Sequence, residues 1–366
     1  MLGLFGASFK RNKGDDVIKH YIIPIFIPHY GCNHQCIFCN QQKITGMVTP
    51  VDAQHVQQTI DVHLERITEQ RFIEVAFYGG SFTALPLELQ QRLLTPAYQA
   101  LQRGQVNGIR LSTRPDCITD EIVDNLLAFN VTVVELGVQS LDEAVLTASQ
   151  RGHTVDDVKN AADILRRREV SFGIQIMPGL PGEDWHSLLL TANRAIALKP
   201  HFARLYPTIV IDKTELATCY LQGLYQPLTL EAAIQKTAFL KLFFEQYNIP
   251  VIRTGLQATE ELDNAGTVLA GPYHSAFGEL VDGYLFFQML LQAFEKIPHS
   301  SEPIIIRHHR RDQSKIRGIS NCYFHQLQQA VHRPIKLVEG TLREGEISIE
   351  QDYLQYVISR KMLFFT

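Results

Sequence analysis

The sequence predicts an α/β protein, a partial or complete parallel (β/α) barrel followed by a smaller C-terminal α+β unit. Residues 20–255 alternate between short apolar strand-like runs and segments with helical periodicity. This alternation stops after about residue 260. The chain has 366 residues, 45% of them hydrophobic, which is enough for one large core and a smaller appended one.

The first region contains six strand-like runs separated by helical patterns. The strands are expected at 22–28, 73–78, 108–112, 132–137, 171–177 and 202–210, with a further one at 250–253. Helices are expected at 52–67, 89–101, 120–129, 185–196 and 230–247. Six such units require right-handed crossovers and a parallel sheet. A barrel and an open doubly wound sheet both fit this pattern, and in a barrel the ligand site lies at the carboxyl ends of the strands.

The last hundred residues have a different pattern. A glycine-rich stretch, 266–283, leads into an apolar helix expected at 284–294. A strand, a helix and two further strands are then expected at 303–308, 323–331, 335–339 and 346–349. We therefore predict an N-terminal extension over 1–20, a barrel domain over 21–260 and an accessory unit over 261–366.

Charge and hydropathy limit the class of protein. The formal net charge of −4 differs from the strongly basic profile of a protein that wraps nucleic acid over a whole face. The most apolar run, 284–294, is interrupted by Gln288 and Gln292, so we expect a buried helix and no contact with a membrane. The apolar start of the chain is too short for a signal peptide. These features predict a cytoplasmic protein.

Three of the six cysteines lie within eight residues, directly after the first predicted strand. Cys32, Cys36 and Cys39 form a C-x3-C-x2-C motif, which in a cytosolic chain indicates a metal or redox centre. A zinc site would need a fourth ligand, here His29, His34 or a distant cysteine. An iron–sulfur cube can take three cysteines and leave one iron for an outside ligand. The position at the end of a barrel strand favours the cluster, with zinc and metal-free thiols as alternatives.

The same motif, with Phe38 before its last cysteine, resembles the signature of the radical S-adenosylmethionine (SAM) superfamily. The resemblance implies that Cys32, Cys36 and Cys39 hold a 4Fe–4S cluster whose unique iron is chelated by S-adenosylmethionine. An electron from the cluster would then cleave the sulfonium and give a 5′-deoxyadenosyl radical that abstracts hydrogen from substrate. Phe38 would lie near the adenine, or alternatively fill the space between the loop and the barrel.

A glycine pair at the end of the second predicted strand is similar to the Gly-Gly motif of this superfamily. That motif binds the ammonium group of S-adenosylmethionine largely through backbone oxygens. Glycine suits the task because a Cβ would block a ligand that lies against the main chain. The resemblance therefore assigns Gly79, Gly80 and Ser81 to cofactor binding.

Three polar residues resemble further cofactor contacts of oxygen-independent coproporphyrinogen oxidase and its relatives. Gln139, at the end of the fourth strand, would bind the ribose hydroxyls, or alternatively satisfy a loop. Arg151 would pair with the methionine carboxylate, which a guanidinium binds through two hydrogen bonds. Gln175 lies where those relatives carry a ribose-binding aspartate, and the amide is a departure from their pattern.

Longer segments are similar to one family, the radical half of the Elongator catalytic subunit, which modifies the wobble uridine of tRNA at C5 using acetyl-CoA. They occur in the same order, at 112–116, 136–140, 151–154, 177–181 and 204–211. The short first cysteine gap and a tail unlike an acetyltransferase depart from that family. We therefore expect a stand-alone bacterial Elongator-like protein without the acetyltransferase domain.

The resemblance implies a radical SAM enzyme that modifies RNA, with a tRNA wobble uridine as its substrate and a flavodoxin- or ferredoxin-like electron donor. The basic run 307–311, with Lys315 and Arg317, would contact phosphates, or alternatively form a solvated face. Arg204 and Tyr206 would point into a closed barrel and contact substrate. Two other functions stay open: an enzyme for a small molecule or peptide, and a non-catalytic protein that carries a cluster or haem.

Overall fold

A seven-stranded parallel sheet is the largest element of the computed structural model, which describes residues 19–27, 36–40, 51–257, 259–264, 266–297, 302–351 and 354–363. Every neighbouring pair in the sheet is parallel. Its strands, in spatial order, are β1 (Lys19–Ile27), β2 (Arg71–Gly79), β3 (Gly108–Thr113), β4 (Val131–Gln139), β5 (Ser171–Ile176), β6 (Phe202–Leu205) and β8 (Val251–Thr254).

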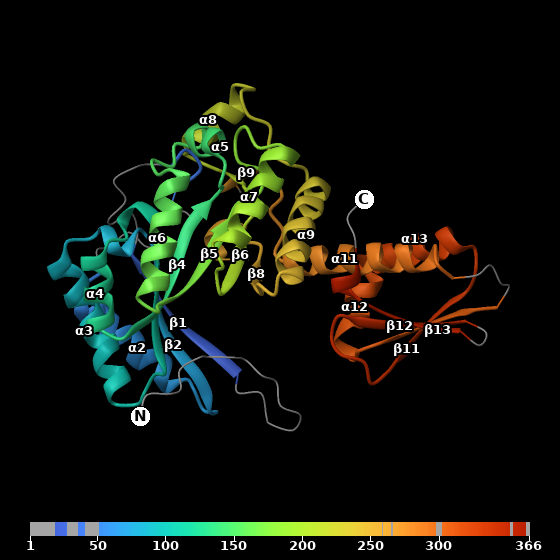
Figure 1. Cartoon of the computed structure of the whole chain (residues 1–366), viewed down its shortest axis with the longest axis horizontal. Helices are drawn as coiled ribbons and strands as arrows, with labels where there is room; N and C mark the ends of the chain where they lie inside the picture. Colours follow the sequence, from blue (N-terminus) through green and yellow to red (C-terminus); the bar gives the residue numbers. More distant parts are fainter. Residues whose placement is uncertain are drawn as a thin grey trace.

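The spatial order of these strands follows their order in the chain without a reversal. A doubly wound sheet reverses its order at a switch point, so that alternative is excluded. The sheet curls into a half-barrel (Figure 1). Among the described residues β1 and β8 do not pair, which makes the barrel partial.

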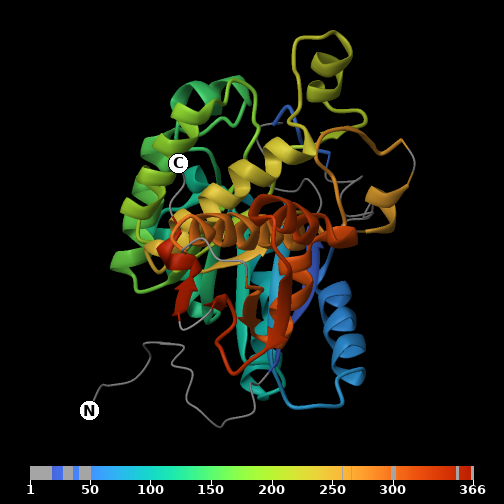
Figure 2. The same ribbon diagram turned by 90° about the vertical axis from the view of Figure 1, so that its right-hand side faces the viewer.

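Helices cover the convex face of the sheet, with α2 on one side and the green helices on the other in Figure 2. They are α2 (Ala53–Glu65), α3 (Leu87–Gln102), α4 (Asp120–Ala128), α6 (Val155–Arg167), α7 (Trp185–Ala197) and α9 (Leu230–Gln246). The strand residues that pack against them alternate along each strand, as Ile23, Val75 and Ile174 illustrate. Because successive side chains of a strand point to opposite faces, the residues between them lie on the concave face.

The longest helix that was not expected from the sequence is α6. Helix α6 begins with a capping box, in which the Thr154 side chain accepts from the Asp157 backbone and the Asp157 side chain accepts from the Thr154 backbone. Its buried residues Val155, Val158 and Leu165 recur with helical spacing. These signals are present in the sequence and would have predicted the helix.

The sixth strand is shorter than predicted. Strand β6 ends at Leu205, and Val210–Ile211 form a separate strand, β7, which pairs with β9 (Val268–Ala270). Pro207 lies between them and has no N–H group for a continuing ladder. The further strand expected near 250–253 is confirmed as β8.

The C-terminal unit projects from α9 at the right of Figure 1. Its sheet has the order β11-β10-β12-β13, formed by β10 (Ile304–His308), β11 (Ile335–Glu339), β12 (Glu346–Gln351) and β13 (Leu354–Ser359). Its helices are α11 (Phe277–Phe294), α12 (Gln313–Arg317) and α13 (Cys322–Val331). Strand β13 and helix α12 were not expected, whereas the strands predicted at 303–308, 335–339 and 346–349 and the helix predicted at 323–331 are confirmed.

Helix α11 begins earlier than expected, inside the glycine-rich stretch. Gly283 lies inside this helix. A Cβ at this position would lie only 3.0 Å from the Tyr323 ring. The glycine therefore allows close helix packing and is not a turn signal. Within the part of the chain that the structure describes, no helix is both long and apolar enough to span a bilayer.

Helix α9 contributes to both cores. Leu240 and Phe244 pack in the core of the half-barrel, whereas Ala238 and Leu242 pack against α11 and the C-terminal sheet. A helix that is apolar on both sides is buried between two layers. The predicted division at residue 260 stays a prediction.

Candidate cofactor site

The described part of the cysteine loop is held at the carboxyl end of the half-barrel. The N–H of Ile37 donates to the Ser149 carbonyl at 3.4 Å, after helix α5 (Glu143–Ala148). The Ile37 carbonyl accepts from Leu216 N at 2.7 Å, in helix α8 (Glu215–Leu221). Cys36 and Cys39 belong to this part, whereas Cys32 lies outside the described residues. Two elements therefore fix the loop where a barrel binds its ligand.

An arginine lies directly on the sulfur of Cys36. Arg151 Nη1 donates to Cys36 Sγ at 2.9 Å, and the Cys36 side chain is buried. Among the described residues, no three His, Cys, Asp or Glu side chains gather as potential metal ligands.

Phe38 is buried beneath the loop. It packs with Leu180 and Leu216, and the guanidinium carbon of Arg151 lies 5.9 Å from its ring centroid. These contacts agree with a ring that fills the space under the loop. Its predicted position near an adenine stays a prediction.

The glycine pair joins the ends of the first two strands. Gly80 N donates to the Ile27 carbonyl at 2.6 Å. Gly79 has a φ of +100°, and a Cβ there would lie 2.9 Å from the same oxygen. Glycine is thus required by the backbone itself, which brings the pair next to the strand that leads into the cysteine loop.

Ser81 is engaged within the protein. Its hydroxyl lies 2.9 Å from the Thr113 hydroxyl and accepts from Arg114 N at 3.2 Å. The side chain is almost fully buried. These contacts tie the end of β2 to the end of β3, so we now expect Ser81 to contribute to cofactor binding through this support.

Gln139 has an unusual backbone at the end of β4. Its φ is +68°, next to a register irregularity between Leu136 and Gln139. The side chain is buried, yet its Oε1 has no hydrogen-bond partner. A strained backbone and an unsatisfied buried oxygen are both rare, and together they are typical of a functional position.

Arg151 connects the strand ends to the cysteine loop. Besides its contact with Cys36, its Nη2 donates to the Gly137 carbonyl at 2.6 Å. Its Nε is buried without a hydrogen-bond partner. Its backbone carbonyl accepts from Arg114 Nη1 at 2.6 Å, and Arg114 is held by two 2.9 Å hydrogen bonds to Asp116. Arg151 is therefore fixed from both ends.

Three side chains that each carry one of these unsatisfied polar atoms lie near one another. A Cβ on Gly137 would lie 3.1 Å from Gln139 Nε2 and 3.3 Å from Arg151 Nη2, so both side chains lie beside this glycine. His153 belongs to the same group, since its Nε2 lies 3.3 Å from the Val138 carbonyl and its Nδ1 has no partner. Buried polar groups are normally paired, so this cluster is suited to a polar ligand.

His153 was not identified from the sequence. Burial, together with the charges of Arg151 and Arg114, lowers the pKa of its imidazole to about 3. The ring is therefore neutral near pH 7, and one of its nitrogens can accept a hydrogen bond. The sequence feature that could have identified His153 is its position two residues after Arg151.

Gln175 and Arg204 lie on the concave face beside each other. They are neighbours in the register of β5 and β6, and both are partly exposed. Arg204 also forms an ion pair with Glu135 at 2.6 Å. The expected inward orientation of Arg204 is confirmed. The buried charges Glu74, Arg110 and Glu135 were missed, although each interrupts an apolar strand run.

Two family models match consecutive segments of the chain. Residues 26–195 match the family model described as the radical SAM superfamily, and residues 200–286 match the radical SAM C-terminal domain. This chain carries a radical SAM domain followed by a radical SAM C-terminal domain. A solved archaeal Elp3 from Methanocaldococcus infernus, with an N-terminal deletion, has the same fold. Its TM-score is 0.58 at 22% identity, covering 73% of this chain and 63% of that chain.

Two curated proteins show how far this radical SAM protein is similar in sequence. The tRNA uridine(34) acetyltransferase of Methanocaldococcus jannaschii is 27% identical over 58% of this chain and 42% of its own length. The heme chaperone HemW of Lactococcus lactis is 25% identical over 53% of this chain and 51% of its own length. The match therefore spans about half, or less, of each relative.

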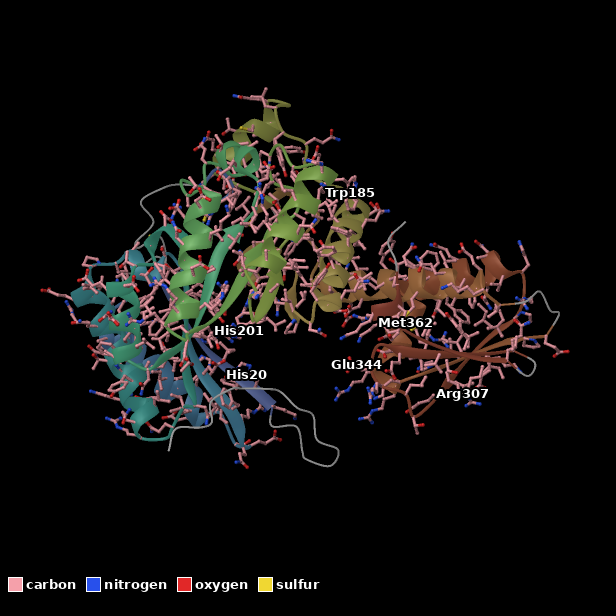
Figure 3. The ribbon with its side chains drawn as sticks, viewed as in Figure 1. His20, Trp185, His201, Arg307, Glu344 and Met362 are labelled. Carbon is pink, nitrogen blue, oxygen red and sulfur yellow. The ribbon has the colours of Figure 1, made fainter. Side chains whose placement is uncertain are left out.

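The basic run of this radical SAM protein lies in the C-terminal unit, where Figure 3 labels Arg307 and Glu344. Arg307 pairs with Glu350 at 2.6 Å, and Arg311 lies 3.7 Å from Glu344. Lys315 pairs with Glu344 at 3.0 Å. Because acidic partners offset much of this charge, the run is less suited to binding phosphates than its sequence indicates.

Proposed function

We propose that this chain is an enzyme that holds a 4Fe–4S cluster with Cys32, Cys36 and Cys39 and binds S-adenosylmethionine beside it. When bound, the cluster supplies the electron that cleaves the sulfonium and yields a 5′-deoxyadenosyl radical for hydrogen abstraction. The observation that carries this proposal is Arg151, which contacts Cys36 Sγ and lies among buried polar atoms without partners. The radical SAM domain over residues 26–195 supports the same cofactors.

The residues at the strand ends match the groups of S-adenosylmethionine. Gln139 Oε1 would accept from a ribose hydroxyl, with Gln175 on the next strand. Arg151 would donate to the methionine carboxylate. The backbone oxygens at Gly79 and Gly80 would accept from its ammonium. Each assignment uses a polar atom of the strand ends next to the cysteine loop.

Cysteine variants test the cluster. Anaerobic reconstitution should give about four iron and four sulfide per chain, as a single cube requires. Replacing Cys32, Cys36 or Cys39 by alanine should abolish this content. Cys219→Ala is the matched control and should keep it, because Cys219 lies in α8 outside the motif. Stoichiometric zinc without absorbance near ~400 nm would contradict the proposal.

The proposed substrate is RNA, at a wobble uridine of tRNA. This proposal is supported by the similarity to proteins named tRNA uridine(34) acetyltransferase and Elongator complex protein 3. A tRNA substrate also places the protein in the cytoplasm, where a flavodoxin- or ferredoxin-like protein would donate the electron. Nucleoside mass spectrometry of tRNA from a deletion strain should show an altered uridine-34. An unaltered profile would favour a small-molecule or peptide substrate.

The similarity to a heme chaperone supports a second candidate, a protein that carries a cluster or haem without turnover. The two candidates differ in chemistry. An enzyme should form 5′-deoxyadenosine from S-adenosylmethionine under dithionite, even without substrate. Tight haem binding with no 5′-deoxyadenosine would favour the chaperone.

A further inference from the structure

The concave face of the half-barrel carries a network of charged and aromatic residues. At its centre is Glu135 of β4, which pairs with Arg204 of β6 at 2.6 Å and with Arg110 of β3 at 3.1 Å. Arg110 also pairs with Glu74 at 3.1 Å. The side chains of Glu74, Arg110 and Glu135 are buried, so this part of the network is closed to solvent.

The network holds two tyrosines in fixed positions. Arg204 Nη2 donates to the Tyr78 hydroxyl and Arg204 Nη1 to the Tyr206 hydroxyl, both at 3.0 Å. The Arg204 guanidinium also lies 5.5 Å from the centroid of the Tyr78 ring. Arginine suits this position because its planar fork can bond to several partners at once. The Arg204 guanidinium therefore fixes the hydroxyls of both tyrosines.

The aromatic side of the network is open. Tyr78 and Tyr206 are partly exposed, in contrast to the buried carboxylates beneath them. Phe26 of β1 is also partly exposed, and its ring centroid lies 6.4 Å from that of Tyr78. Tyr78 directly precedes the Gly79–Gly80 pair, so these rings lie next to the candidate cofactor site.

The charges of this network are balanced. Two arginines, Arg110 and Arg204, face two carboxylates, Glu74 and Glu135. Burial also raises the pKa of the Tyr78 phenol, which keeps it neutral. The charges directly beneath the rings are therefore paired, and Arg253 of β8, the register neighbour of Arg204, lies beside this network. A flat, neutral ring is the ligand that it fits.

We propose that Phe26, Tyr78 and Tyr206 form a platform on which the uridine base of the RNA substrate stacks, with Arg204 and Glu135 as positioning residues. The proposal rests on the function proposed above and assigns its substrate site. Bases of single-stranded RNA are recognised by stacking on aromatic side chains, and each stacked base contributes substantially to affinity. Phosphate contacts elsewhere would hold the RNA without reading this base.

A comparison of two RNAs isolates this contact. The cluster-loaded full chain, with S-adenosylmethionine, is titrated anaerobically with an anticodon stem-loop that carries uridine 34 and with the same RNA abasic at that position. The ratio of the two affinities measures the base alone. Wild-type protein should prefer the uridine RNA about tenfold or more.

Variants assign the preference to the platform. Tyr206→Leu should bring the ratio close to one, whereas Tyr206→Phe should keep it within about threefold, because a phenyl ring still stacks. Phe26→Leu should lower the ratio independently. Tyr247→Ala is the control, since Tyr247 is 55% exposed outside the concave face, at the end of α9, and it should leave the ratio unchanged.

The outcomes separate this inference from the proposed function. A wild-type ratio near one, or a Tyr206→Leu protein that keeps the wild-type ratio, would overturn the platform even when cluster and cofactor binding are intact. A chain that binds neither cluster nor S-adenosylmethionine would instead overturn the proposed function. Iron content and thermal unfolding of each variant show whether it is folded and loaded.

Discussion

Arg151 has three partners that come from different parts of the chain. It donates to Cys36 Sγ and to the Gly137 carbonyl, and its own carbonyl accepts from Arg114. The sequence identified Gln139, at the end of β4, and Arg151, in the segment between α5 and α6, through their motifs. It did not identify the partners, since these contacts depend on how strands β3 and β4 meet the cysteine loop.

Arg151→Ala should weaken S-adenosylmethionine binding about tenfold or more, as expected for the loss of a hydrogen bond to a charged group. The iron and sulfide content should stay unchanged, because the cysteines are intact. Equilibrium dialysis with the reconstituted protein measures the affinity. Arg167→Ala is the control, since Arg167 is exposed on α6. Equal affinities of the two variants would show that Arg151 has no role in binding the cofactor.

His153 gives the chain without cofactor a pH dependence. The pKa of its imidazole is near 6.5 in the unfolded chain. In the folded chain this pKa is lowered to about 3, mainly because the ring is buried. The unfolded chain therefore binds more protons below pH 6.5, and the free energy of unfolding falls as the pH drops from 6.5 towards 3. His153→Gln should reduce the loss between about pH 7 and 5 by about 1–2 kcal/mol. Urea unfolding at the two pH values tests this, and an unchanged loss would contradict it.

At the scale of elements, the loop between β5 and α7 is fixed by a buried ion pair. Glu183 Oε1 accepts from Gly179 N at 2.8 Å and from Lys236 Nζ of α9 at 2.9 Å. Tyr225 donates to the Gly179 carbonyl at 2.7 Å. The same loop carries Leu180, which packs on Phe38. The pair thus joins α9 to the cysteine loop.

Replacing one residue of this ion pair should lower the free energy of unfolding more than replacing both residues together. Glu183→Gln or Lys236→Met alone leaves a buried charge without its partner, which typically costs about 3–5 kcal/mol of unfolding free energy. The double variant should cost clearly less than the sum of the two. Urea unfolding of all four proteins gives the coupling, and simple additivity would show that the pair is not coupled.

The elements differ in how well the sequence predicts them. Strands β2 and β5 follow from their apolar runs and the glycines or prolines that end them. Strand β6 was predicted too long because its apolar pattern continues past Pro207. The pairing of Glu135 with Arg110 and Arg204 could not be predicted, because it joins three strands that are distant in the sequence.

For the whole molecule, the parallel direction of the strands explains why the candidate cofactor-binding residues lie at one edge of the sheet. Parallel strands end on the same side, so the cysteine loop, Gly79–Gly80 and Gln139 meet at one edge. The sequence predicted this edge and its motifs. The aromatic platform on the concave face required the structure, since a half-barrel and a flat sheet have the same sequence periodicity.

The proposed reaction depends on a cube, held by three cysteines, whose fourth iron is open to S-adenosylmethionine. It is tested most directly by the electron paramagnetic resonance spectrum of the reduced, reconstituted chain before and after addition of S-adenosylmethionine. The cluster signal should change shape on addition, because the cofactor would bind the open iron. A cluster signal that S-adenosylmethionine leaves unchanged, or a chain that holds only zinc, would contradict it.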